Sequence, residues 1–598
     1  MSAPIKTNQL TYTFDKELFS KNYDIFCIRT SEKHFKNGAY IIDTPLLSNN
    51  VCSVLFKSGR EIFVLMKSNG SNKSLLKNAI LKEDGADRIT ISQVTPNSLK
   101  DDIVFQLMLN SLGNYESPLL KFNNLTGHLY CFHPNWLIRG RKSEADVVFK
   151  VPCLELRLSS EFRLNMEVHT FTSELLRNKI EFKKKKFDEY PKYIFSAHNT
   201  LRRKLKDDVG YSFIMRQTKN AKTEIAFLDI QNIDRFNQSK MGILTTVLEN
   251  FNDRFSSIAH LDFESITDYK ALDYTRSVAN ENKQAISDLL SIKPIKIVDC
   301  IDDEYSKILC KEICDLLLSK YGIKTSCGKR VAKDHLNIRV IHNAAFYADS
   351  DDPHRIFNDV AVQHITFEDF SECSEFAIST VIHEMLIKAD LVKQKISLFD
   401  WNTLGLKDDI DFGIEVTDEQ NTKYIFMTIH PDGTFNISEQ TLNLFEANKY
   451  NQCVEIFENA KMNSVKVHGI IRDALGNINI IKDTEWFTIP EIYSIKAELA
   501  NGNTKLRGKE KRNELLPSCL DIKMFNDGVS EYYFVGTIGN GMRCLINRAA
   551  NIRKIEPFED SILMFEKLLP LMNVTFVHNG QLTIIPFPFK YLREHLNK

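Results

Sequence analysis

The chain has 598 residues, too many for one hydrophobic core, and its length predicts about three or four domains. Hydrophobic residues at 43% and charged residues at 26% are typical of a globular protein and exclude a disordered or fibrous chain. The net charge of −1 excludes a uniformly basic nucleic-acid binder, so any basic surface must be local.

Targeting signals and paired cysteines are missing from the sequence. The N-terminus lacks the basic, apolar and small-residue order of a signal peptide. No apolar run approaches the roughly 18 residues of a membrane span. The 12 cysteines include no CxxC pair, and the closest two, Cys310 and Cys314, have helical spacing. We therefore expect a cytoplasmic protein with reduced cysteines, no membrane partner and no bound metal.

The first part of the chain alternates short strand-like runs with turns. Residues 154–158 and 163–168 alternate with period two around Ser159 and Ser160, which predicts a β-hairpin. A second hairpin is predicted over residues 210–229. Residues 1–175 are therefore interpreted as a β-rich N-terminal domain.

Basic residues interleaved with aromatic ones follow, over residues 177–206. Such a mixture suits the phosphate backbone and bases of a nucleic acid, although a solvated helix face gives the same pattern. Arginines near a helical spacing recur after residue 540 and indicate a second basic face. The candidate backbone contacts are Lys183, Lys184, Lys185, Arg202, Arg203, Arg543 and Arg548.

Strand and helix patterns alternate over residues 295–400 and predict a small α/β domain with a parallel sheet. Ligands of such domains bind at the carboxyl ends of the strands. The polar residues placed near that end would suit a terminal phosphate and a base edge, although satisfied structural groups are the alternative. They are His342, Asn343, His354, Arg355, Gln363, His364 and Lys388.

Residues 411–417 and 423–429 read as two antiparallel strands, and residues 465–471 as a third strand ending at Asp473. This order is typical of the opening of an RNase H-like sheet, which in active enzymes presents carboxylates to a metal pair.

From the parallel-sheet domain to the C-terminus the chain resembles the MID–PIWI half of a prokaryotic Argonaute. The resemblance rests on the order Gln-His-Ile-Thr at 363–366, a helix ending near Lys388, the Gly-Ile-Glu-Val strand at 413–416 and the closing run at 576–591. It implies a multidomain α/β protein. Its parts are the β-rich domain at 1–175, a basic linker with a reduced or absent PAZ domain at 176–290, a Rossmann-like MID domain at 291–405 and an RNase H-like PIWI domain at 406–598.

The resemblance also implies a site for the 5′-phosphate of a short guide. Gln363 and Lys388 fall on the family's phosphate-binding glutamine and lysine, and His354 and Arg355 lie in the same neighbourhood without matching its pattern. No cofactor is expected to be required, and Mg²⁺ at the guide 5′ end is the one ion that the resemblance allows.

The catalytic positions of the family are degenerate in this chain. Glu415 replaces the first Asp, Asp473 matches the second, and Arg593 falls where active members carry Asp or His. Arginine cannot ligate a divalent cation, and a longer Glu side chain would misplace a metal. We therefore expect an inactive nuclease.

The expected function is guide-dependent recognition of target DNA in defence against plasmids or phage. The guide is expected to be DNA, with RNA as the alternative. An inactive Argonaute would require an effector, which we expect to be a separate helicase–nuclease, as in bacterial plasmid-defence systems. The alternatives are an active RNase H-like nuclease that uses Asp411, Glu415, Asp473 and Asp483, or a protein-binding scaffold of a defence complex.

Overall fold

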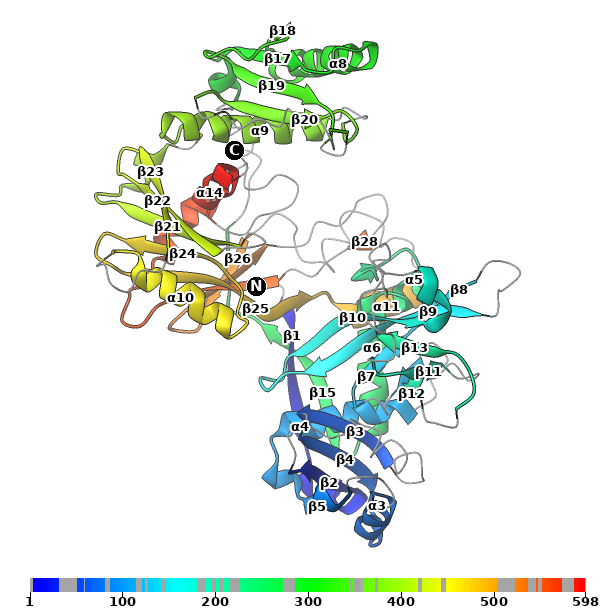
Figure 1. The fold of residues 1–598 in the computed structure, drawn as a ribbon. Coiled ribbons are helices and arrows are strands. Elements are labelled where there is room, and N and C mark those ends of the chain that lie inside the picture. Colours follow the sequence, from blue (N-terminus) through cyan, green and yellow to red (C-terminus); the bar gives the residue numbers. More distant parts are fainter. Residues whose placement is uncertain are drawn as a thin grey trace. The chain divides into compact units, whose positions relative to one another are not determined.

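The chain forms two compact units, each built from segments that are distant in sequence. In the computed structural model (Figure 1) the first unit comprises residues 1–267, 485–519 and 539–550, and the second comprises the remaining residues. The described residues are 4–31, 51–58, 60–80, 86–114, 121–123, 127–140, 147–179, 190–195, 201–204, 208–215, 225–272, 286–291, 293–343, 346–347, 357, 359–370, 375–398, 400–417, 422–441, 448–502, 522–535, 545–546, 551–572 and 586–596.

In the first unit, a four-stranded antiparallel sheet has the order β3-β4-β2-β5. Its strands are β2 (Tyr23–Thr30), β3 (Val51–Ser58), β4 (Glu61–Lys67) and β5 (Ile89–Val94), with α1 (Lys16–Asn22) and α3 (Asn72–Ile80) beside them. The strand β1 (Ile5–Phe14) pairs with β15 (Ala259–Ile266). The helices α4 (Asp101–Asn110), α5 (Ile233–Asn237), α6 (Lys240–Arg254) and α11 (Ile492–Ala500) contribute to the main core of this unit.

The larger sheet of this unit contains the predicted hairpin. It consists of β6 (Lys121–Asn123), β7 (Leu129–Phe132), β8 (Ile138–Arg139), β9 (Val148–Leu158), β10 (Leu164–Ser173), β11 (Tyr193–Phe195), β12 (Leu201–Arg203) and β13 (Ser212–Met215). Leu158 pairs with Leu164 across the turn, so the hairpin prediction is confirmed. Leu154 and Leu156 face the main core, whereas Cys153 faces a smaller cluster on the other side of the sheet, as period two requires.

The predicted hairpin over residues 210–229 is wrong. Instead of pairing with each other, β13 pairs with β10 and β11, and β14 (Leu228–Asp229) pairs with β28 (Leu545–Ile546). Both runs have strand character, but long-range partners decided their pairing, which local alternation cannot reveal.

In the second unit, four parallel strands form a sheet with the order β18-β17-β19-β20 (Figure 1). They are β17 (Ile295–Asp299), β18 (Ser326–Gly328), β19 (Leu336–Ile341) and β20 (Val362–Thr366). The helices α8 (Glu304–Tyr321) and α9 (Glu375–Lys393) bury apolar residues against this sheet. A capping box of Asp303 and Ser306 begins α8, and Gly322 ends it with a positive φ of 69°.

A second, larger sheet follows in the chain order. Its central part has the order β29-β25-β24-β21-β22-β23, formed by β21 (Ile410–Thr417), β22 (Thr422–Ile429), β23 (Phe435–Gln440), β24 (Val467–Asp473), β25 (Ile478–Ile489) and β29 (Asn551–Pro557). The strands β16 (Lys270–Leu272), β26 (Ile522–Asn526) and β27 (Glu531–Val535) extend it.

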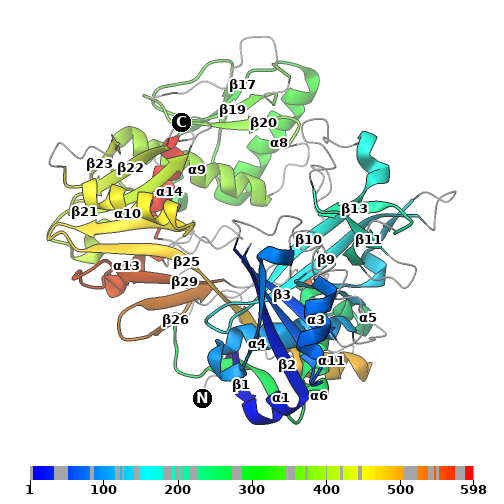
Figure 2. The ribbon, with the colours of Figure 1, turned by 60° about the horizontal axis from the view of Figure 1, so that its bottom comes forward.

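Helices cover this sheet on two faces. The helix α10 (Asn451–Met462) lies along one face of the sheet (Figure 2). Its Val454 and Phe457 share a buried cluster with Tyr424 and Ile470. The helices α13 (Phe565–Met572) and α14 (Pro588–Leu596) share a different cluster with Phe412 and other residues of β21 and β22. A mixed α/β, multidomain architecture was predicted, and the structure confirms it. Within the described residues, no helix combines the length and apolar character needed to cross a membrane.

A buried carboxylate connects α9 to the C-terminal helix. Asp390 has no solvent exposure, and its Oδ2 accepts hydrogen bonds from the Tyr591 hydroxyl, 2.7 Å away, and from the Ser397 backbone N–H at 2.8 Å. The Ser397 hydroxyl also donates to Asp390. Because a buried carboxylate must be hydrogen-bonded, these contacts fix how α14 packs on α9.

We predict that Tyr591→Phe lowers the stability of this unit by about 1–3 kcal/mol, because it removes a donor from a buried acceptor while keeping the ring. Calorimetry should show a lower melting temperature. The matched control is Tyr305→Phe on α8, where the side chain is 71% exposed and the change should have no effect. Equal melting temperatures for the two variants would contradict the role of this contact.

Candidate nucleic-acid site

Gln363 and Lys388, predicted from the motif order, lie beside the same carboxylate. Gln363 is the second residue of β20, and its Nε2 donates to Oε2 of Glu384 on α9 at 2.8 Å. Lys388 lies four residues after Glu384 on the same helix, one turn further along. Oε1 of Gln363 is buried and has no hydrogen-bond partner among the described residues.

The C-terminal helix adds two charged groups to this site. Nζ of Lys590 lies 3.8 Å from Oε1 of Glu384 and 3.3 Å from Oε1 of Glu594. The Glu594 side chain is only 6% exposed. The resulting cluster, which we call the α9–α14 cluster, consists of Gln363, Glu384, Lys388, Lys590 and Glu594. It therefore contains two carboxylates, two ammonium groups and one amide.

Burial and neighbouring charges shift the protonation of this cluster. Burial raises the pKa of Glu384, and the nearby Glu594 carboxylate raises it further, whereas Lys590 and Lys388 act in the opposite direction. Burial lowers the pKa of Lys388, against the attraction of Glu594 and Glu384. Both shifts are typical of functional sites, although structural ion pairs also produce them.

The polar residues predicted to gather at one end of the parallel sheet form two separate groups. At the carboxyl end of β19, Nδ1–H of His342 donates to Oε1 of Glu368 at 2.7 Å, and the ring of His342 stacks on Phe346 with centroids 3.8 Å apart. Gln363 instead lies near the start of β20, where it pairs with Ile338. The helix α9 follows β20 and runs back along the sheet. Lys388 is 13 residues after the first residue of α9, which corresponds to about 20 Å along the helix axis.

Several predicted contacts lie outside the described residues. These are His354, Arg355, Lys183, Lys184, Lys185, Arg543 and Arg548. The two predicted arginines that are described belong to β12, where Arg202 pairs with Ile194 and Arg203 pairs with Tyr193. The Arg203 guanidinium lies over the Tyr193 ring, 4.9 Å from its centroid. The basic stretch thus includes a strand at the edge of the sheet.

The predicted catalytic positions are not brought together. β24 runs antiparallel to β21, and Asp473 is opposite Ile410, five residues before Glu415. At about 3.4 Å per residue, Glu415 is therefore about 17 Å along the sheet from the position opposite Asp473. Asp473 accepts from the N–H groups of Leu475 and Asn477 and so holds the β24–β25 turn. Arg593 lies on the exposed side of α14.

The remaining carboxylates of the nuclease alternative are neutralised by cations. Asp411 is 3% exposed and contacts Lys449 at 2.9 Å and Arg472 at 3.2 Å, and it also accepts from the hydroxyls of Thr428 and Tyr450.

Asp483 is held in the same way by His468 at 2.6 Å and Arg553 at 2.9 Å, with Lys466 4.0 Å away. Neither Asp411 nor Asp483 belongs to a metal-type cluster. In the part of the chain that the structure describes, the one group of three ligand atoms within 4.8 Å of each other is formed by Glu155, Glu167 and His169.

Sequence reasoning missed Glu384, Lys590 and Glu594. The spacing of four residues between Glu384 and Lys388, and between Lys590 and Glu594, is a signal for contacts within one helix. It does not reveal that the two helices meet, because that contact depends on the Asp390–Tyr591 hydrogen bond.

No family model matches the chain, and no curated protein matches it in sequence. In three dimensions it is similar to Marinitoga piezophila Argonaute in complex with 5′ OH guide RNA and target DNA, with 10% identity and a TM-score of 0.43, covering 98% of this chain and 97% of that chain. The same protein with 5′ OH guide RNA gives 8% identity and a TM-score of 0.38 over the same shares.

Asp483 gives a pH-dependent prediction. Burial would raise the pKa of Asp483, but hydrogen bonds from His468 and Arg553 outweigh this effect and lower it to about 2. A lowered folded pKa stabilises the protein above the unfolded value, near 3.9, and the contribution disappears as the pH falls toward 2. The lowered pKa of Asp483 corresponds to about 2 kcal/mol in the free energy of unfolding.

Asp483→Asn should therefore lower the melting temperature at pH 6, and the difference from the unmodified chain should shrink as the pH is lowered from 4 to about 3. The exposed Asp560 provides the control variant, Asp560→Asn, which should show no such difference. A gap that stays constant over this pH range would contradict the ion-pair assignment.

Proposed function

We propose that this protein binds the 5′ end of a short single-stranded guide at the α9–α14 cluster and uses the guide to recognise a complementary DNA. The observation that supports this proposal most strongly is the convergence of Gln363 and Lys388 on Glu384. The sequence pattern alone predicts both residues as contacts of the guide end. A partly buried lysine and an amide supply donors for the terminal oxygen of a nucleic acid.

The charge of the cluster determines which guide end it accepts. Two carboxylates balance two ammonium groups, so the cluster offers no net positive charge to a phosphate dianion. Glu384 lies between Gln363 and Lys590 and would repel such a group. We therefore propose that a 5′-hydroxyl is bound at least as well as a 5′-phosphate.

Mg²⁺ takes oxygen ligands, but Lys590 contacts both carboxylates of the cluster, and Gln363 presents its Nε2 rather than its oxygen to Glu384. The residues present therefore do not fit Mg²⁺, and we propose that the guide end is bound without this ion.

We also propose that the chain does not cleave its target. The separation of Glu415 and Asp473, and the cations on Asp411 and Asp483, support this proposal. A two-metal site requires carboxylates that converge on ions about 4 Å apart. An inactive recogniser requires an effector, and a helicase–nuclease acting against plasmid or phage DNA in the cytoplasm is the partner that we propose.

The guide can be identified directly. The full chain is purified from plasmid-bearing cells, and the bound nucleic acid is extracted, end-labelled before and after phosphatase treatment, and digested with DNase or RNase. We expect a short, uniform species that is lost in the Gln363→Ala, Lys388→Ala double variant and retained in the control Lys311→Ala, an exposed lysine on α8. If no short species co-purifies and synthetic oligonucleotides also fail to bind, a protein scaffold becomes the better interpretation.

Glu384→Gln tests the charge argument. Glutamine keeps an oxygen that can accept from Gln363 but removes the negative charge. We expect the affinity for a 5′-phosphorylated oligonucleotide to rise about tenfold in EDTA, with little change for the 5′-hydroxyl form. Fluorescence anisotropy measures both affinities. An equal change for the two oligonucleotides would show that Glu384 does not contact the guide end.

A further inference from the structure

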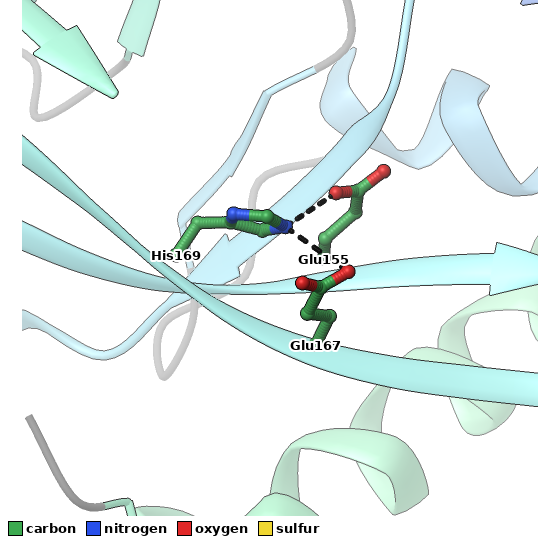
Figure 3. A group of neighbouring side chains, drawn as sticks. All are labelled: Glu155, Glu167 and His169. Carbon is green, nitrogen blue, oxygen red and sulfur yellow. Dashed lines mark ion pairs between the residues drawn. The ribbon is translucent and has the colours of Figure 1, made fainter. Parts of the chain in front are cut away.

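A second cluster of ligand-type side chains lies in the first unit, on the face of the large sheet opposite the main core. Glu155 is on β9, and Glu167 and His169 are on the neighbouring β10, with Glu167 directly opposite Glu155 (Figure 3). His128 immediately precedes β7, which pairs with β9 on its other side. The four residues thus come from three adjacent segments of one sheet.

Glu155 is at the centre of this group. Its Oε2 lies 2.7 Å from Nε2 of His169, and its Oε1 lies 2.8 Å from Nδ1 of His128. Nε2 of His169 is also 3.6 Å from Oε2 of Glu167. One ligand atom each from Glu155, Glu167 and His169 lies within 4.8 Å of the others. Figure 3 shows both carboxylates directed at the same imidazole nitrogen.

Burial makes the negative charge of this group unfavourable unless a cation balances it. The Glu155 side chain is only 6% exposed, and His169 is 18% exposed. One N–H on Nε2 of His169 cannot serve two carboxylates well, and two adjacent carboxylates with neutral imidazoles leave negative charge in a partly buried place. Among the described residues, the fixed cation that contacts this group is Arg157, whose Nε is 3.8 Å from Glu155 and whose side chain is 65% exposed.

We propose that Glu155, Glu167 and His169 bind one divalent transition-metal ion, with zinc the best match. One imidazole nitrogen and two carboxylates form a three-ligand set of the kind that zinc accepts, with a water molecule as the fourth ligand of a tetrahedral site. The ligand atoms are now at hydrogen-bonding or slightly larger separations. A tetrahedral site with bonds of about 2.0–2.1 Å requires separations near 3.3 Å, which side-chain adjustments of about 1 Å provide.

The ion would connect β9 and β10. His128, which precedes β7, would hold the second oxygen of Glu155 and so orient that ligand. It would stabilise the sheet that also includes β12 with Arg202 and Arg203. The inference does not depend on the proposed guide site, since its residues all belong to the first unit.

The test uses the full chain, treated with EDTA and dialysed, then titrated with ZnCl₂ by calorimetry and with CoCl₂ by absorption. We expect one equivalent of zinc per chain, a higher melting temperature with zinc, and visible cobalt bands of a tetrahedral site without near-ultraviolet sulfur bands. Sulfur bands would place the metal at the thiols of Cys314 and Cys327, which are 3.4 Å apart, and would overturn the proposal.

Variants at exposed positions separate ligation from folding. Glu167 is 67% exposed, so Glu167→Ala should fold normally and weaken zinc binding by about tenfold or more. Glu161→Ala is the matched control, since Glu161 is 64% exposed on the turn of the same hairpin, and it should bind zinc as the unmodified chain does. Absence of zinc binding to the unmodified chain, or equal binding by both variants, would overturn the proposal.

Discussion

The hydrogen bond between the buried Asp390 carboxylate and the Tyr591 hydroxyl determines the arrangement of the candidate site. Asp390 is near the end of α9, and Tyr591 is in the last helix of the chain, about 200 residues later. A buried carboxylate tolerates few positions of its partners, so this contact sets how the two helices meet. Lys590 and Glu594, on either side of Tyr591, are thereby placed next to Glu384.

This placement explains why the site has a balanced charge. Lys388 alone, partly buried on α9, would form a simple anion site with Gln363. The C-terminal helix brings one ammonium and one carboxylate, and Glu384 adds a second carboxylate. We propose that a site of this composition distinguishes a neutral end from a charged end by local repulsion rather than by overall affinity. The net charge of −1 for the whole chain gives no indication of this local balance.

Much of the fold and part of the site follow from local sequence. The hairpin around Ser159, the capped helix α8 and the parallel strands near residue 340 were predicted from alternation, capping residues and apolar runs. Gln363 and Lys388 were predicted from the order of a family pattern, and their role in binding stays a prediction. The antiparallel pairing of β21 with β24, which separates Glu415 from Asp473, was not predicted. The alternation of side chains along a strand is the same whichever way the neighbouring strand runs, so it does not reveal the direction. The group around Glu155 was also missed, because its members, from His128 to His169, are separated by up to 41 positions in the chain and only strand pairing brings them together.

The central claim is that the protein recognises the free 5′ end of a guide. The most direct measurement compares the affinity of the full chain for one short single-stranded oligonucleotide in linear form with its affinity for the same sequence closed into a circle. Both forms have the same bases and nearly the same backbone charge, so they differ chiefly in the end itself. The account predicts that the linear form binds and that the circle binds much more weakly. Equal affinities would contradict it, because they would show that the protein binds the backbone without recognising an end.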